Sequence, residues 1–245
     1  MVHVIIIYDL ETTGIDTLSD RIIQFAARVK CQTTGFEYNS YVNPENRQMS
    51  KIAKDVTGIT QESLSRQPNF LSVWKRFRNL FCNFLKGIQE ELKGIQEEYG
   101  EKKDELVLNF LGHNSANFDD ILLAVEFARS GINVKNPFNI RGFDFRIQCA
   151  DTLKACREAK KQGKITPGNL RLSTLYQLVT QKCLEGAHDA QTDCWAVECL
   201  LTNRHIATNL IFESWHDRSV ALHKRIEARK YRNCKSQRQI SPGGK

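Results

Sequence analysis

The sequence predicts a single α/β domain built on a mixed β-sheet. Three strand-like segments come first, and strand-like and helix-like segments alternate afterwards, an order typical of such a domain. The 245 residues can bury a sizeable core, and 41% hydrophobic with 26% charged residues is typical of a globular chain. The sequence has no run of 18 or more apolar residues, so we expect no transmembrane helix.

The first three strands are expected at residues 2–10, 21–30 and 35–44. The first is an aliphatic run, VHVIIIYDL, and the next two alternate between β-branched or aromatic residues and polar ones. A Thr-Thr-Gly step and an Asn-Pro step supply turns. Together they predict an antiparallel meander.

A long helical region is expected after the meander, beginning within residues 60–85. Its apolar residues recur at helical spacing, and we expect this stripe to be core rather than a stacking surface. The stripe consists of Phe70, Val73, Trp74, Phe77, Leu80, Phe81 and Phe84. Residues 86–105 then contain a tandem repeat, KGIQEEL and KGIQEEY, rich in charge, which predicts a solvated helical insertion.

The second half of the chain alternates between two strands and several helices. Two more strands bring the expected sheet to five. The strands are expected at residues 106–114 and 143–153, and the helices at 117–131, 153–164, 170–181 and 189–206. We expect the domain to span residues 1–210, followed by a basic helix over 211–232 and a disordered basic tail over 233–245.

Charge and cysteine content bear on partners and location. Residues 216–245 hold nine Lys or Arg and two acids, so they carry the whole net charge of +7. Such a segment is typical of polyanion binding, although solvated tails are also common. The eight cysteines form no CxxC pair, and the N-terminus has no signal-peptide pattern, so we expect an intracellular protein, cytoplasmic or nuclear.

Acidic residues gather at the ends of three predicted elements. Asp9 and Glu11 point to the same face of the first strand, where two like charges repel unless a proton or cation lies between them. Asp119 and Asp120 begin one helix, and Asp193, preceded by His188, begins another; taken alone, each pattern is more typical of capping or surface chemistry.

Together these side chains form a working set for hydrolysis of a phosphodiester. Hard oxygen ligands without cysteine favour Mg²⁺ or Mn²⁺, and two such ions can stabilise both the attacking and the leaving oxygen. A histidine beside them is a natural base for deprotonating water near neutral pH.

Three motifs resemble those of the DnaQ-like 3′–5′ exonucleases of the DEDDh group. They are YDLETTG, HNSANFD and HDAQTD, and the segments VTGITQESLSRQPNF and CADTLKACREAKK also resemble the family pattern. The resemblance covers roughly residues 3–202. It implies an RNase H-like fold and metal-dependent hydrolysis from the 3′ end of DNA or RNA, releasing nucleoside monophosphates.

The resemblance also implies a role for each site residue. Asp9 would bridge two Mg²⁺ or Mn²⁺ ions, Glu11 and Asp193 would complete the shell of one, and Asp119 would serve the other. Asp120 would be a helix-start residue, and His188 would be the general base. The 3′-terminal nucleotide would lie near these residues, and its expected contacts are Leu10, Thr12, Thr13, His113, Asn114 and Phe118; for Leu10 and Phe118, core packing is the alternative.

Two features depart from the family, and two alternatives stay open. Many family members have histidine in place of Thr57, so one substrate contact is expected to be absent or altered, and residues 86–105 form a longer link than usual. The alternatives are a proofreading subunit docked on a polymerase and an inactive nucleic-acid-binding module. The motifs leave open DNA versus RNA, single strand versus duplex, and the oligomeric state.

Overall fold

A six-stranded mixed sheet organises the fold. The computed structural model describes residues 1–99 (backbone only over 91–99), 106–140 and 143–222. The strands lie in the order β3-β2-β1-β4-β5-β6, so β1 is near the centre. Their bounds are Val2–Thr12 (β1), Ile22–Cys31 (β2), Thr34–Tyr41 (β3), Leu106–Gly112 (β4), Phe145–Asp151 (β5) and Glu213–Ser214 (β6).

The predicted mixed sheet and meander are confirmed, but the strand count is wrong by one. Strand β1 pairs with β2 in antiparallel register and with β4 in parallel register. The additional strand β6 pairs with Cys149 and Gln148 of β5 over only two residues. So short a strand, inside a segment expected to be helical, has no period-2 pattern to reveal it.

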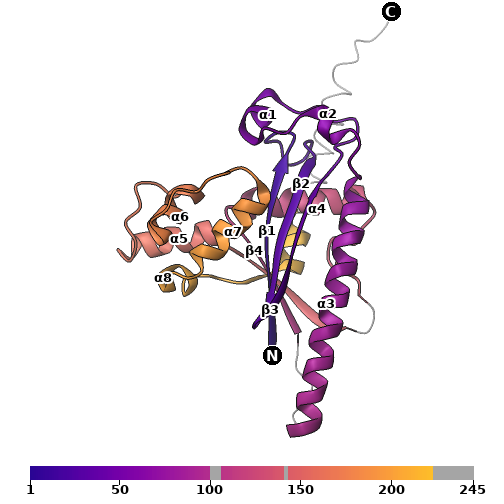
Figure 1. Ribbon diagram of the computed structural model, residues 1–245, viewed down its shortest axis with the longest axis vertical. Helices are drawn as coiled ribbons and strands as arrows, with labels where there is room; N and C mark the ends of the chain where they lie inside the picture. The colour runs from indigo at the N-terminus through magenta and orange to yellow at the C-terminus, as the bar shows by residue number, and fades with distance from the viewer. Residues whose placement is uncertain (100–105, 141–142, 223–245) are drawn as a thin grey trace, which may run out of the picture.

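Helices cover both faces of the sheet (Figure 1). Because side chains alternate along β1, Ile6 and Tyr8 pack toward α3 and α4, whereas Ile7 packs toward α7. The helices are α1 (Lys51–Thr57), α2 (Gln61–Leu64), α3 (Phe70–Tyr99), α4 (Asp119–Arg129), α5 (Thr152–Lys161), α6 (Leu172–Thr180), α7 (Ala190–Leu200) and α8 (Arg204–Ala207), with a 3₁₀ turn η1 at Ser115–Asn117.

Helix α3 places its aromatic stripe in the core, as the spacing predicts. Trp74, Phe77 and Phe81 are 2% exposed or less, and Phe77 packs edge-on against Phe25 of β2 with ring centroids 5.2 Å apart. Leu80, expected in the stripe, is instead 48% exposed, because it lies at the border where the helix surface turns from the sheet toward solvent.

The charged insertion begins as a continuation of α3. The helix runs unbroken to Tyr99, as the repeat predicts, and residues 100–105 lie outside the described part of the chain. Ile88 is only 7% exposed and packs on the main core, so the first turn of the insertion is not simply a solvated surface.

The C-terminal segment belongs to the same core. The helix predicted over 211–232 begins later than expected, because β6 occupies part of it, and residues 215–222 are helical. Trp215 is fully buried, and its Nε1 donates to the Val134 carbonyl oxygen at 2.9 Å. The rest of that predicted helix and the predicted tail lie outside the described residues. No helix in the described ranges is long and apolar enough to cross a membrane.

The contrast between Phe81 and Leu80 can be tested on one helix. We expect Phe81→Ala to lower the free energy of unfolding by about 3–5 kcal/mol, because it leaves a cavity in the core. Leu80→Ala should change it by less than about 1 kcal/mol, because Leu80 is already 48% exposed. Urea denaturation of both variants measures the difference, and equal losses would show that this description of α3 is wrong.

Candidate active site

One open cleft brings the predicted acids together. It has a volume of about 610 Å³, and it lies where the C-terminal part of β1 meets the beginnings of α4 and α7. Every residue of the predicted catalytic set and four predicted substrate contacts line it. They are Asp9, Glu11, Asp119, His188 and Asp193, with Leu10, His113, Asn114 and Phe118.

Strand geometry explains why the acids face one another. Asp9 and Glu11 point to the same side of β1 as Ile7, which packs against α7. Helix α7 begins after Asp189, whose side chain accepts from the backbone N–H of Thr192, and so presents Asp193 in its first turn. One ligand atom each from Glu11, His188 and Asp193 lies within 4.8 Å of the others.

Burial and mutual repulsion raise the pKa of every acid in this set. Burial first, then the charges of Asp119 and Asp193, raises the pKa of Asp9 well above its usual value. Burial and neighbouring acids likewise raise the pKa of Glu11 and that of Asp119 to about 8. The pKa of Asp193 rises only to about 6, since the charge of His188 opposes the effect of burial.

The residues of this cleft fit a divalent cation. Asp193 Oδ1 is buried and has no hydrogen-bond partner among the described residues, although such atoms are normally satisfied. Four carboxylates and the His188 imidazole, without a thiolate, form a donor set suited to Mg²⁺ or Mn²⁺. A cation would satisfy the unpartnered oxygen and also relieve the repulsion between the acids.

The two neighbouring acids at the start of α4 point to different places. Asp119 lines the cleft, whereas Asp120 is fully buried away from it. Asp120 accepts a hydrogen bond from the Tyr8 hydroxyl and forms an ion pair with Arg218. The structure therefore puts Asp119 rather than Asp120 among the cleft acids, but Asp120 is more than the helix-start residue that we expected.

His188 has an unusual backbone conformation. Its φ is +67°, in the left-handed region that residues other than glycine adopt rarely. Its backbone N–H donates to Asp193 Oδ2 at 3.3 Å, and its side chain is exposed at the cleft. Backbone strain of this kind persists where the surrounding structure enforces it, which is common at functional sites.

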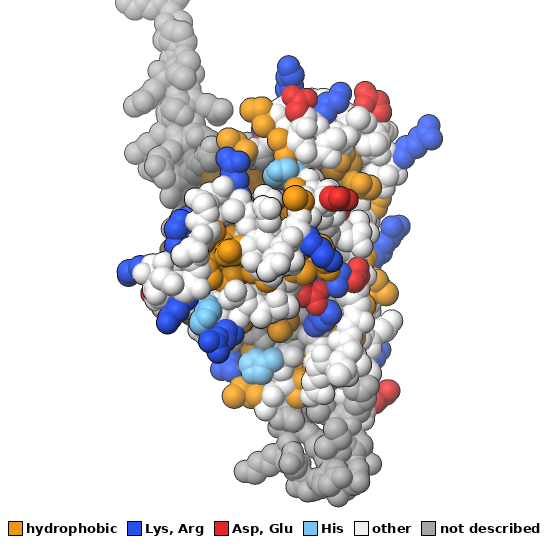
Figure 2. All heavy atoms as spheres, turned by 60° about the vertical axis from the view of Figure 1, so that its left-hand side comes forward, with side chains coloured by type: hydrophobic (Ala, Val, Ile, Leu, Met, Phe, Trp, Pro, Cys, Tyr) orange, Lys and Arg blue, Asp and Glu red, His pale blue; other side chains and the backbone are white. Residues whose placement is uncertain are grey.

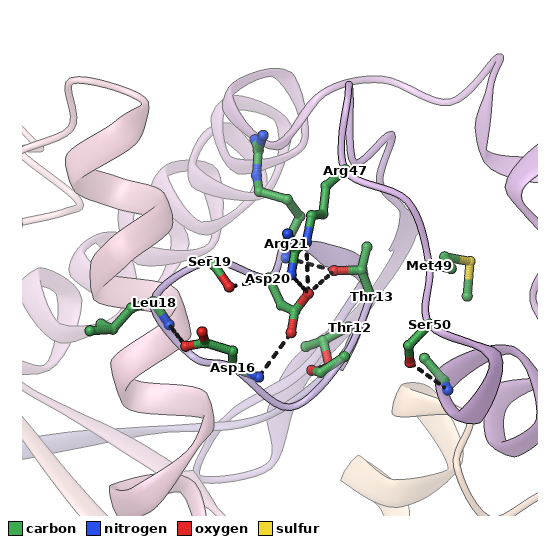
Figure 3. A network of polar contacts seen from close by, with 12 residues as sticks. Thr12, Thr13, Asp16, Leu18, Ser19, Asp20, Arg21, Arg47, Met49 and Ser50 are labelled. Carbon is green, nitrogen blue, oxygen red and sulfur yellow. Dashed lines mark hydrogen bonds and ion pairs between the residues drawn. The ribbon is translucent and has the colours of Figure 1, made fainter. Parts of the chain in front are cut away.

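The turn after β1 is held by a buried carboxylate (Figure 3). Asp20 accepts from Thr13 Oγ1 at 2.8 Å and from the Asp16 backbone N–H at 2.8 Å, and it pairs with Arg47. Thr12 Oγ1 donates to the Gly14 carbonyl oxygen at 2.7 Å. Both threonines predicted as substrate contacts thus use their hydroxyl groups to shape the turn. They line a second cleft rather than the first.

His113 and Asn114 are held by residues that the sequence motifs did not single out. The His113 ring contacts Thr152 Oγ1 at 2.9 Å and the Leu170 carbonyl oxygen at 3.1 Å, so both of its nitrogens already have partners. Asp151 accepts from the Asn114 backbone N–H at 2.8 Å. The Asp-Thr step after the β5 pattern was the available signal for Asp151, as a helix N-cap.

Leu10 and Phe118 border two adjoining clefts. Both side chains pack on the core, and both also line the acidic cleft and the second cleft. Core packing and a place at the cleft are therefore compatible for these two residues. The far wall of the second cleft is α1, where Ile52 is 72% exposed. Thr57 also lines this cleft; its Oγ1 donates to the Ala53 carbonyl oxygen at 2.8 Å and accepts from the Ile59 backbone N–H at 3.1 Å.

The raised pKa values predict how metal-free stability depends on pH. A carboxyl whose pKa is higher in the folded protein stabilises the fold at low pH, and this contribution is lost as pH rises toward the folded pKa. In chelator, we expect the free energy of unfolding to fall between about pH 4.5 and about pH 8.

Removing one charge should weaken this decrease of the free energy of unfolding with rising pH. Asp9→Asn is expected to raise the metal-free free energy of unfolding near pH 8 by on the order of 1 kcal/mol, because it relieves repulsion. The exposed Asp144 supplies the control variant Asp144→Asn, which should leave the pH profile unchanged. Chemical denaturation at several pH values measures both, and a loss of alkaline stability in Asp9→Asn would contradict the account of repulsion.

Comparisons with known proteins find similarity to exonucleases and to DNA polymerase subunits. Residues 6–91 match a family model described as exonuclease. The chain is 35% identical over 86 residues to DNA polymerase III subunit epsilon of Buchnera aphidicola, a match that covers 32% of this chain and 36% of that protein. It is 34% identical over 74 residues to DNA polymerase III PolC-type of Bacillus subtilis, covering 30% of this chain and 5% of that protein. The chain thus spans only a fraction of the length of these relatives.

Solved structures extend the likeness in fold to most of the chain. Escherichia coli exonuclease I in complex with a dT13 oligonucleotide superposes with a TM-score of 0.61 at 20% identity, covering 84% of this chain and 42% of that one. The cell-death related nuclease CRN-4 gives a TM-score of 0.55 at 20% identity, covering 85% and 65%. The resemblance expected from the motifs is confirmed: residues 6–91 match the exonuclease family model, and most of the chain shares its fold with these solved nucleases.

Proposed function

We propose that the protein is a metal-dependent 3′–5′ exonuclease. It would hydrolyse the last phosphodiester of single-stranded DNA, RNA or both, and release nucleoside 5′-monophosphates. The observation that carries this proposal is the convergence of Asp9, Glu11, Asp119, Asp193 and His188 on one open cleft.

The charge balance of the cleft supports a cation-dependent reaction. Among the described residues that line it, four are acids and Arg171 is the only lysine or arginine. A phosphodiester is itself an anion, so this cleft would repel its own substrate whenever its acids are ionised. Bound Mg²⁺ or Mn²⁺ would supply the missing positive charge and stabilise charge on the reacting oxygens.

The protein's own residues would then hold the reactants and move one proton. Asp9, Glu11, Asp119 and Asp193 supply the oxygen ligands. His188, exposed beside Asp193, would take a proton from a water molecule whose oxygen attacks the phosphorus. The bond from phosphorus to the 3′ oxygen of the preceding nucleotide breaks, that oxygen takes up a proton from solvent, and the phosphate stays on the 5′ oxygen of the released nucleotide.

The two adjoining clefts suit the end of a single strand. Leu10 and Phe118 lie between them, so bases could contact an apolar edge from either side. Apolar and aromatic contacts accept any base, which favours a nuclease without sequence preference. The Thr57 hydroxyl is engaged within the protein by Ala53 and Ile59, so an altered substrate contact at this position remains part of the proposal.

Surface charge and the solved relatives also favour nucleic acid. On the face that carries α5–α8, Lys and Arg side chains outnumber Asp and Glu (Figure 2). Residues 152–210 contain eight Lys or Arg and five acids, two of them Asp189 and Asp193 at the start of α7. A positive surface beside the cleft would attract a polyanion. Exonuclease I, which shares this fold, has been solved with an oligonucleotide bound.

The proofreading alternative rests on one observation, the sequence match to a DNA polymerase subunit. An enzyme that works alone should digest oligonucleotides without a polymerase, whereas a docked subunit should gain activity when its polymerase is added. The inactive alternative has less support, because no member of the acid and histidine set is missing. We also propose an intracellular setting, supported by Cys149, Cys156 and Cys194, which lie buried as small apolar side chains.

Single substitutions test the proposed chemistry. We expect Asp9→Ala to abolish release of mononucleotides, and His188→Ala to lower the rate by about 10²–10⁴-fold, the usual contribution of a general base. The matched control is Asp144→Asn, an exposed acid outside the cleft, which should keep full activity. Circular dichroism verifies the fold of each variant, and wild-type rates in Asp9→Ala or His188→Ala would refute the assignment.

The basic segment beyond the described residues gives a separate prediction. Residues 233–245 contain Lys235, Arg238 and Lys245 and no acid, so they would contact phosphates without reading sequence. We expect their deletion to weaken binding of a single-stranded oligonucleotide and to flatten its dependence on salt. Fluorescence anisotropy at several salt concentrations measures the slope, and an unchanged slope would rule out this contact.

A further inference from the structure

A buried polar cluster lies on the opposite face of β1 from the acidic cleft. The carboxylate of Asp120 accepts a hydrogen bond from the Tyr8 hydroxyl and pairs with the Arg218 guanidinium. Tyr8 and Asp120 are 1% exposed or less, and the Arg218 side chain is 9% exposed. A second nitrogen of Arg218 donates to Glu213 at 2.6 Å.

Each buried member of this cluster is next to a cleft acid in the chain. Tyr8 precedes Asp9 on β1, and because side chains alternate along a strand, the two point to opposite faces of the sheet. Asp120 follows Asp119 in the first turn of α4. A contact between Tyr8 and Asp120 therefore also controls how far Asp9 lies from Asp119.

A second contact holds the same two elements on the cleft side. The backbone of Leu10, the residue after Asp9, interacts with the Asp119 carboxylate and lowers its pKa against the rise that burial causes. The start of α4 thus holds β1 at two positions, one on either side of Asp9. Through one hydrogen bond alone, helix and strand could still pivot; two contacts in different directions prevent this.

Arg218 supplies the cationic partner of Asp120 in that position. A buried carboxylate without a cationic partner is strongly destabilising, and it would be displaced toward water or neutralised. Arg218 comes from the C-terminal helical residues 215–222, which lie beyond the family match at 6–91 and beyond the domain end expected at residue 210.

We propose that Tyr8, Asp120 and Arg218 are positioning residues that fix the separation of Asp9 and Asp119 and thereby set the affinity of the cleft for divalent cations. We refer to these three residues as the rear clamp. The inference rests on the proposed function, since it assigns a cation site to Asp9 and Asp119. It also gives the C-terminal segment a role in the active site that is separate from its basic charge.

A simpler role for Arg218 would be to dock the C-terminal segment on the core. Trp215 separates the two roles, because it anchors the same helical segment through Val134 and touches none of the three clamp residues in any described polar contact. Trp215→Phe loses that hydrogen bond but keeps an aromatic ring in the core. It should lower the melting temperature without altering the clamp.

The test is calorimetric titration of the full chain with Mn²⁺ alone, well below the melting temperature of each variant. We expect Arg218→Gln to weaken Mn²⁺ binding by roughly 10–100-fold, as is usual when residues that orient metal ligands are replaced. Arg218→Lys keeps the charge and should recover part of the loss. Tyr8→Phe removes one hydroxyl and should weaken binding by at least about threefold, whereas Trp215→Phe should stay within about twofold of wild type.

Two results would overturn the rear clamp. One is wild-type Mn²⁺ affinity in Tyr8→Phe, a variant mild enough to fold even if Arg218→Gln does not. The other is a loss in Trp215→Phe as large as that in Arg218→Gln, which would reduce Arg218 to a docking residue. The titrations contain no nucleic acid, so they do not depend on nuclease activity. If the wild-type chain releases no nucleotides but the clamp variants lose Mn²⁺ affinity, the proposed function is refuted and the rear clamp is supported.

Discussion

Repulsion between carboxylates on one face of a strand is the constraint on which the rest of the site depends. Asp9 and Glu11 cannot avoid each other, because the pleat of β1 points them the same way. Burial raises the pKa of both acids, and Asp119 and Asp193, which come from two helix starts, raise it further. Such an arrangement is costly for a folded chain by itself, and it becomes favourable when cations are present. The stability of the fold and its proposed chemistry are therefore linked through the same four side chains.

The surrounding structure holds these acids in place with contacts that avoid the cleft. Asp20 accepts a hydrogen bond within the turn after β1, Asp151 accepts one from the loop before α4, and Asp189 caps the start of α7. Each is a carboxylate whose oxygens accept hydrogen bonds from the protein itself. The cleft acid Asp193 also accepts one such bond, through Oδ2, but its Oδ1 has no partner among the described residues.

Much of the fold followed from local patterns, and the parts that did not follow depend on distant contacts. The aliphatic run of β1 and the aromatic stripe of α3 predicted their burial correctly, because period 2 and period 3.6 directly encode a buried face. Strand β6 is too short to show a period, and Leu80 lies at the border of its helix face. The partnership of Asp120 with Arg218 joins residues 98 positions apart, and no local pattern could indicate it. For the site, motif spacing was enough to choose Asp119 over Asp120, whereas the internal engagement of His113 and Thr13 required coordinates.

The direction of digestion tests the central claim most directly. Single-stranded DNA and RNA oligomers labelled at the 5′ end would be incubated with the full chain and Mg²⁺ or Mn²⁺. The account predicts a ladder of labelled fragments that shorten one nucleotide at a time, with nucleoside 5′-monophosphates released and no reaction in chelator. Immediate release of the labelled 5′ nucleotide, internal cleavage without a ladder, or undiminished digestion in chelator would contradict it.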